Sequence, residues 1–213
     1  MKRLALFLLM VDAALVSACL PDSDHESDGV ADKPADVLAQ AQAAPDDCLL
    51  LVWSSQTERK PEFDRDHDFV EGGAISCATG TSASQFDAAI STLRDAAKSG
   101  NKARLLREVG LPLLYIDGDG NRREIESRHE VEAVFDEIFD PSMIDVLQKI
   151  DLSQMSVAKD QGGFFELGAI WLVVDRDGGR PRLMTVNRQA LDEALDTARE
   201  QADRNQGKPI PFD

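Results

Sequence analysis

The chain has 213 residues, with 23 Lys and Arg against 39 Asp and Glu, so its formal net charge is −16 at pH 7. Such a charge argues against nucleic-acid binding, which requires basic surfaces that neutralise phosphates. It also argues against docking on anionic lipid surfaces beyond any lipid anchor, and it favours solubility and the steering of cationic partners.

The first nineteen residues have the layout of a secretory signal. Lys2 and Arg3 precede an apolar run that stops at small residues just before Cys19, which gives a positive start, an apolar middle and a cleavage site. The run is short of the roughly 20 apolar residues that a membrane span needs, and Asp12 interrupts it. A plain secretory signal with an incidental cysteine is the alternative interpretation.

Because a cysteine directly follows the small residues, this segment resembles that of a bacterial lipoprotein. The resemblance implies that residues 1–18 are a cleaved signal peptide and that Cys19 is the acylated N-terminus, carrying palmitate or a similar lipid. Leu20 stands where many enteric lipoproteins of the inner membrane have an aspartate. The resemblance therefore implies an outer-membrane lipoprotein that faces the periplasm. A secreted, an inner-membrane-anchored or a Gram-positive surface protein is the alternative.

The stretch after Cys19 has the composition of a tether. Residues 20–47 hold eight acidic residues, one lysine and three prolines, with almost no large apolar side chain. Such a stretch buries too little apolar surface to offset its ordering entropy, and its like charges favour extension. We therefore expect a disordered acidic tether over 19–47, a single α+β domain over 48–205 and a loose tail over 206–213.

The other two cysteines, Cys48 and Cys77, form an even pair. In an oxidising compartment a disulfide between them is the natural interpretation. Closing a loop of about 30 residues would stabilise the fold by roughly 3–4 kcal/mol on a chain-entropy argument. A metal site is the rival, but histidines at ligand spacing do not accompany the two cysteines. If Cys19 carries lipid, no free thiol is left for catalysis.

The domain is expected to begin with a hairpin. Two short apolar runs, Leu49–Trp53 and Ala74–Ala78, have strand length, and the disulfide would tie them together. A polar loop with the acidic run Asp64–Asp68 separates them. We therefore predict an N-terminal hairpin stapled by Cys48 and Cys77.

Two helices and a hairpin are predicted next. Ser82 and Gln85 fit a capping box, and apolar residues recur at helical spacing through Ala97. A shorter helix is predicted over 102–108. A strand over 111–116, a turn over 117–121 and a polar strand over 122–126 follow.

The next segment predicts two more helices. Ser127 and Glu130 form a second capping box, and an apolar stripe follows it. Asp140-Pro141 ends this helix, and the proline is well placed to open the next one through Ile150.

Three antiparallel strands and a final helix complete the prediction. The strands are expected over 155–159, 164–175 and 182–187, separated by glycine-rich turns. The middle strand is apolar on both faces, so we expect it to be covered on each side. Apolar residues from Leu191 to Ala202 mark a last amphipathic helix.

In this order of elements the chain resembles the nuclear-transport-factor-2-like (SnoaL-like) family over residues 82–187. The segments that carry the resemblance are Ser84–Asp87, Gly110–Leu114 and Gly168–Trp171. The resemblance implies a curved antiparallel sheet that packs on the N-terminal helices and forms a cone-shaped pocket. The stapled hairpin and the final helix would be additions to that core.

The resemblance suggests where chemistry could occur, although no family catalytic set maps onto the chain. Candidate pocket residues are Tyr115, Glu166, Ile170 and Leu172. If Ile170 and Leu172 face the pocket, Glu166 shares their face because strand side chains alternate, and burial would raise its pKa. Alternatively, Glu166 is solvated and Tyr115 is a core residue with a hydrogen-bonded hydroxyl. We assign no catalytic residue.

Two acidic runs raise the question of calcium. Residues 117–121 begin like an EF-hand loop, but Arg122 and Arg128 stand at its glycine and closing glutamate positions. Asp64–Asp68 also lacks a closing glutamate. We therefore expect a tight turn at 117–121, and no metal or other cofactor.

These patterns favour a non-enzymatic binding protein held at the membrane through Cys19. A specific form is an immunity or inhibitor protein that neutralises a cationic toxin directed at the cell envelope. One alternative is a cone-pocket enzyme of the isomerase or dehydratase type, or a small-ligand binder, with a carboxylate in its pocket. Another is an envelope assembly factor. The family resemblance also implies a homodimer formed through the open sheet face, unless the added hairpin and final helix cover that face.

Overall fold

The computed structural model of the protein describes residues 45–174 and 179–205, which belong to one compact unit. The predicted signal peptide (1–18), the lipid anchor at Cys19, the tether up to residue 44 and the tail (206–213) lie outside the described residues. Within the described ranges, no helix is both long enough and apolar enough to cross a membrane.

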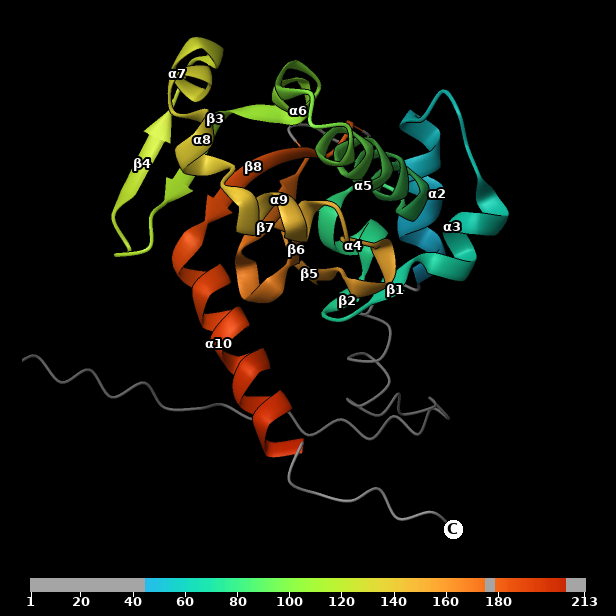
Figure 1. Ribbon diagram of the computed structural model, residues 1–213. Coiled ribbons are helices and arrows are strands. Elements are labelled where there is room, and N and C mark those ends of the chain that lie inside the picture. The colour runs from blue at the N-terminus through green and yellow to red at the C-terminus, as the bar shows by residue number, and fades with distance from the viewer. Residues whose placement is uncertain (1–44, 175–178, 206–213) are drawn as a thin grey trace, which may run out of the picture. The chain divides into compact units, whose positions relative to one another are not determined.

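The described part is a mixed α+β fold with helices on a curved sheet (Figure 1). Its helices are α2 (Pro45–Ser55), α3 (Pro61–His67), α4 (Ile75–Thr79), α5 (Ala83–Lys98), α6 (Lys102–Glu108), α7 (Arg128–Ala133), α8 (Phe135–Ile138), α9 (Pro141–Leu147) and α10 (Arg188–Asn205). Two short 3-10 helices are η1 (Leu152–Gln154) and η2 (Glu166–Gly168).

Six strands form the main sheet, in the spatial order β4-β3-β8-β7-β6-β5. They are β3 (Val109–Ile116), β4 (Arg122–Ile125), β5 (Ser156–Ala158), β6 (Gly162–Phe165), β7 (Ile170–Val173) and β8 (Arg182–Asn187). A separate two-stranded ribbon consists of β1 (Phe69–Val70) and β2 (Gly73–Ala74).

The prediction of a purely antiparallel sheet is wrong, because β3 and β8 pair in parallel. The chain leaves β4 through α7 to α9, enters the sheet again at the far edge with β5, and returns strand by strand to β8. Parallel neighbours require such a long crossover, whereas hairpins join antiparallel ones. The other neighbouring pairs of the main sheet are antiparallel.

One face of the sheet, called the inner face here, packs on helices. Phe86 of α5 lies so close to Gly163 in β6 that a β-carbon on the glycine would come within 3.1 Å of its ring. Helices α5 and α9 pack on each other over this side (Figure 1). Phe86, Ile90, Leu93, Met143 and Leu147 are almost fully buried in the resulting core.

The predicted strand at Leu49–Trp53 is wrong, because this segment belongs to helix α2. Leu49, Val52 and Trp53 are buried, whereas Leu50 and Leu51 are 60% and 73% exposed. Buried residues three and four positions apart form one face of a helix. Five consecutive apolar residues do not distinguish a short strand from part of a helix.

The second half of the predicted hairpin is also wrong. Only Gly73–Ala74 is a strand, and Ile75–Thr79 forms helix α4, which ends at Gly80 in the left-handed conformation. Glycine adopts this conformation without a steric penalty. The disulfide therefore joins two helices, α2 and α4.

The predicted long strand at 164–175 is divided in two. Glu166 and Leu167 adopt positive φ values of 49° and 55°, and Gly168 follows at 92°. This left-handed turn reverses the chain, so β6 and β7 pair with each other as a hairpin. The predicted end of that strand and the first part of the turn before β8 lie outside the described residues.

Most of the remaining predictions are confirmed, but the single helix expected between Ser127 and Asp140 is divided at Val134 into α7 and α8. Helices α5, α6 and α10 and strands β3 and β4 lie close to their expected positions. Ser127 and Glu130 form the expected capping box of α7. Asp140 caps α9, with Pro141 at its first position. The Ser82 side chain, in contrast, does not cap α5.

Candidate functional site

The cross-strand register divides the side chains of the sheet into two sets, because successive residues of a strand point to opposite faces. The inner set is buried and consists of Val157, Gly163, Leu172, Phe165, Ile170, Val186 and Tyr115. The outer set lies side by side across all six strands and consists of Ser156, Phe164, Trp171, Thr185, Leu114 and Glu124. Glu124 is exposed and the other five are half-buried. We call this second surface the outer face.

A stacked aromatic pair occupies the middle of the outer face. The rings of Phe164 and Trp171 lie 4.7 Å apart between centroids, with an angle of 28° between their planes. The indole Nε1 of Trp171 donates a hydrogen bond of 3.1 Å to the carbonyl oxygen of Gly168. This bond fixes the orientation of the indole, so the half-buried pair forms a rigid apolar contact on the outer face.

Acidic residues surround this aromatic centre. At one edge the Ser156 hydroxyl donates a hydrogen bond of 3.1 Å to the carboxylate of Glu71. Glu124 lies at the other edge, on β4. Asp160 and Glu166 occupy the connections at the two ends of β6 and are exposed. Basic residues at the rim are Lys159 and Arg182.

The predicted pocket residues are not gathered around one cavity. Ile170 and Leu172 are 0% and 1% exposed within the hydrophobic core. Tyr115 is also buried there, and its hydroxyl donates a hydrogen bond of 3.3 Å to the carbonyl oxygen of Glu137. Burial, together with the nearby Glu137 carboxylate, raises the pKa of the Tyr115 hydroxyl.

Glu166 lies apart from these three residues. It is exposed in the turn between β6 and β7 and does not continue the strand. The prediction that Glu166 shares the face of Ile170 and Leu172 is therefore wrong, because the strand ends at Phe165.

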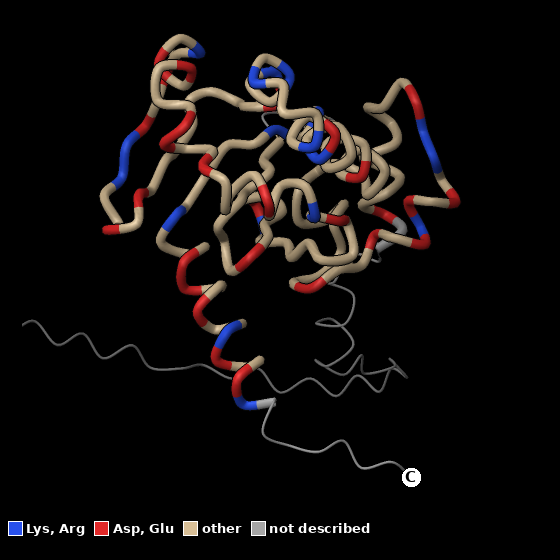
Figure 2. Tube along the Cα trace, viewed as in Figure 1, with Lys and Arg blue, Asp and Glu red and all other residues tan. Residues whose placement is uncertain are grey.

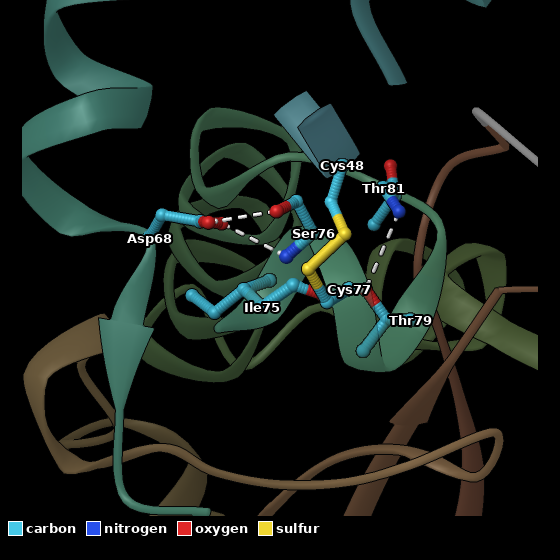
Figure 3. The surroundings of a disulfide bond; sticks show 7 residues. All are labelled: Cys48, Asp68, Ile75, Ser76, Cys77, Thr79 and Thr81. Carbon is cyan, nitrogen blue, oxygen red and sulfur yellow. Dashed lines mark hydrogen bonds between the residues drawn. A yellow bond between two sulfur atoms is a disulfide. The ribbon is translucent and has the colours of Figure 1, made fainter. Parts of the chain in front are cut away.

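The predicted disulfide is confirmed. Cys48 of α2 and Cys77 of α4 are bonded, with their α-carbons 5.1 Å apart (Figure 3). Cys77 is exposed and Cys48 is half-buried. The bond therefore fastens α2 to the rest of the unit from the surface.

The acidic run at 64–68 contains two buried carboxylates that hold helix ends. Asp64 accepts a hydrogen bond from the backbone N–H of Ser84, at the start of α5. Asp68 accepts hydrogen bonds from the backbone N–H and the hydroxyl of Ser76, at the start of α4 (Figure 3). These donors have no partner inside their own helices.

Burial raises the pKa of the Asp68 carboxyl, and the Asp64 charge raises it further, against the lowering effect of the bonds from Ser76. Both carboxylates are therefore structural acceptors. The sequence reasoning considered them only as calcium ligands.

The second acidic run forms the expected tight turn. One carboxylate oxygen of Asp117 accepts hydrogen bonds from the backbone N–H groups of Asp119 and Asn121, both at 2.9 Å. The hydrogen bond from the Asn121 side chain has the largest effect on the pKa of the Asp117 carboxyl, which it lowers, and the backbone hydrogen bonds lower this pKa further. Within residues 45–174 and 179–205, no cluster of three acidic, histidine or cysteine side chains is arranged to hold a metal ion.

The sequence reasoning missed the outer face. It expected the strand with Phe164 and Trp171 to be covered on both sides, because apolar residues occupy both faces. The structure leaves both rings half-buried. The run of apolar residues carries no pattern that could have distinguished the covered side from the open one.

Comparison of the chain with protein-family models, with curated proteins and with solved structures finds no match.

Proposed function

We propose that the protein is a non-enzymatic binding domain of the cell envelope that holds a cationic protein partner on its outer face. The Phe164–Trp171 stack carries this proposal. Aromatic side chains dominate the binding energy of protein interfaces, and a polar rim usually surrounds them. A rigid aromatic pair in the middle of a half-exposed sheet face has this arrangement.

Charge favours a basic partner. The four acidic residues of the rim (Glu71, Glu124, Asp160 and Glu166) outnumber its two basic ones (Lys159 and Arg182), and the whole chain has a net charge of −16. Complementary charge accelerates association and discriminates against acidic competitors. An envelope-directed toxin of basic character fits this surface, so the specific form that we propose is an immunity or inhibitor protein.

The interior supports binding rather than catalysis. Side chains of the hydrophobic core fill the inner face of the sheet, and Tyr115 is hydrogen-bonded among them. Asp64 and Asp68 hold helix ends. A general acid or base must reach its substrate in a cavity, and these groups are already engaged. The curved mixed sheet supports the proposed relationship to the nuclear-transport-factor-2-like fold. In this chain, core side chains would fill the cone-shaped pocket of that fold.

A photo-crosslinking amino acid placed at Thr185, beside Trp171 in the outer row, tests the binding proposal in the native host. The matched control places it at Thr197, which is exposed on α10. We expect the probe at Thr185 to form an adduct with a basic protein. The yield of this adduct should fall at high salt, and the adduct should be absent from the Phe164→Ser/Trp171→Ser variant. An adduct between two copies of the chain would show a homodimer instead. Equal labelling at both positions would contradict the proposal.

The proposed anchor needs a separate test. We propose that Cys19 is acylated and that the protein faces the periplasm from the outer membrane, which the lipoprotein-like order of residues 1–19 supports. Metabolic labelling with a palmitate analogue should mark the wild-type chain and leave Cys19→Ala unlabelled. Label on both chains, or on neither, would contradict this anchor. Separation of the two membranes then locates the protein.

A further inference from the structure

Arginines gather around the last turn of α6, in contrast to the acidic character of the chain. Two of them belong to α6 itself, one begins α7, one begins β8 and one lies two residues before β8. Figure 2 shows basic residues concentrated at α6, away from the acidic residues along α10. We call this set the arginine patch: Arg104, Arg107, Arg128, Arg180 and Arg182.

Hydrogen bonds to the C-terminal turn of α6 hold the patch together. Arg128 Nη1 donates to the carbonyl oxygen of Leu106 at 2.9 Å, and Arg182 Nη1 donates to that of Arg107 at 3.0 Å. The last carbonyls of a helix lack partners inside the helix, and its negative dipole end attracts cations. These bonds place guanidinium groups from two distant segments beside those of α6.

Most members of the patch have no carboxylate partner within residues 45–174 and 179–205. Among the described residues, Arg180 is the one member of the patch with a carboxylate partner, Glu108. Arg104, Arg107 and Arg128 are exposed, and Arg182 is half-buried. Within the part of the chain that the structure describes, four guanidinium groups of the patch therefore lack a carboxylate partner, and three of them are exposed.

An apolar residue borders the patch. Leu111 of β3 is 39% exposed, and it lines a shallow depression together with Arg128, Leu106 and Val109. Pro112 beside it is also exposed. Cations next to an exposed aliphatic edge are typical of surfaces that contact the headgroup region of a bilayer.

We propose that the arginine patch docks on the phosphate headgroups of an anionic lipid bilayer, with Leu111 at the membrane interface. The planar fork of arginine matches phosphate oxygens. The proposal rests on the membrane attachment proposed above. The 25 residues from 20 to 44 would reach at most roughly 90 Å, so the attached domain would stay within that distance of the bilayer.

The net charge of the chain does not prevent this contact. Salt screens exposed charges over about 8 Å at physiological ionic strength. A bilayer in contact with the patch therefore experiences mainly the nearby charges, in which five arginines outnumber Glu108 and the two glutamates of α7, Glu130 and Glu132. The carboxylates of α10 lie at the opposite end of the unit (Figure 2). The total charge alone predicts that the chain avoids anionic lipid, but it does not show that the arginine patch and the carboxylates of α10 lie apart.

The test uses the full chain reconstituted into vesicles, with Leu111→Trp as a fluorescent probe and lipids brominated on the acyl chain as quenchers. We expect quenching of the new tryptophan in vesicles that contain phosphatidylglycerol. Quenching should be lost at high salt, in phosphatidylcholine vesicles, and in Arg104→Glu/Arg107→Glu. The wild-type protein, which retains Leu111, gives the background fluorescence and quenching of Trp53 and Trp171.

The matched control is Arg199→Glu/Arg204→Glu, which changes the net charge by the same amount on α10. Its arginines are exposed, and their ion pairs among the described residues are with neighbours on that helix, so quenching should persist. Flotation with phosphatidylcholine vesicles reports the anchor alone, because these vesicles offer no net anionic surface. Quenching that is equal in both lipids, or unchanged by the Arg104/Arg107 pair, overturns the patch proposal whatever the flotation shows. Equal loss of quenching in Arg104→Glu/Arg107→Glu and in Arg199→Glu/Arg204→Glu would also overturn it.

Discussion

Asp64 of α3 accepts a hydrogen bond of 2.7 Å from the indole Nε1 of Trp53 on α2. The other oxygen of the same carboxylate accepts the backbone N–H of Ser84 at 2.8 Å, and this N–H belongs to the first turn of α5. Asp64 is fully buried. One carboxylate therefore connects three helices, and it replaces the side-chain cap that Ser82 does not provide.

Asp64→Ala should destabilise the protein by about 2–4 kcal/mol. The change leaves the Trp53 indole and the Ser84 amide without partners, and bonds to a charged acceptor are stronger than neutral ones. Chemical denaturation measures the effect. Asp66→Ala, on the same helix but exposed, should leave the midpoint nearly unchanged. Similar midpoints for the two variants would show that the Asp64 bonds contribute little.

Asp68 should make stability depend on pH. Its folded pKa is raised, mainly by burial, so the fold favours the neutral form. This contribution is complete below the unfolded pKa and is lost as pH rises through the folded pKa. Asp68→Asn stays neutral, so the melting temperature of the variant relative to wild type should increase from pH 4 to pH 7. A difference that stays constant, as expected for the exposed Asp66→Asn, would contradict the sign.

Local patterns predicted the elements whose signals lie within a few residues. The capping box of α7 and the Asp140-Pro141 start of α9 form as expected, because each involves neighbouring groups only. The Cys48–Cys77 bond followed from counting cysteines. The apolar run at Leu49–Trp53 failed because its length suits either a strand or a helix.

Long-range pairing could not be predicted in this way. Nothing local to β3 or β8 shows that these strands lie side by side in parallel. Likewise, Arg128 and Arg182 bind α6 from distant segments, so the arginine patch exists only in the folded chain. Tyr115 proved to be a buried residue with a bonded hydroxyl, which was one of the two interpretations open from the sequence.

Removal of the disulfide should weaken the fold without abolishing it. The bond closes a separation of 29 residues, for which chain entropy predicts roughly 3–4 kcal/mol. Leu49, Val52 and Trp53 are buried, so we expect them to keep α2 packed after reduction. Denaturation of Cys48→Ala/Cys77→Ala should show this loss and no response to reductant, whereas wild type should respond. A wild-type midpoint insensitive to complete reduction would contradict the prediction.

Trp171→Ala should cost little stability for so large a side chain, about 1–2 kcal/mol, because its ring is half-buried and loses mainly its stack on Phe164. Phe86→Ala, in contrast, removes a fully buried ring that packs on Gly163. Its cost should be about 3–5 kcal/mol. Denaturation of both variants against wild type compares the outer face with the core.

This comparison decides how the crosslinking result is interpreted. If Trp171→Ala stays well folded, loss of the Thr185 adduct in the Phe164/Trp171 variant reports a lost contact surface rather than unfolding. If Trp171→Ala instead costs as much as Phe86→Ala, the outer face is part of the protein's own core. The aromatic pair would then stabilise the fold, and the binding proposal would lose the observation that carries it.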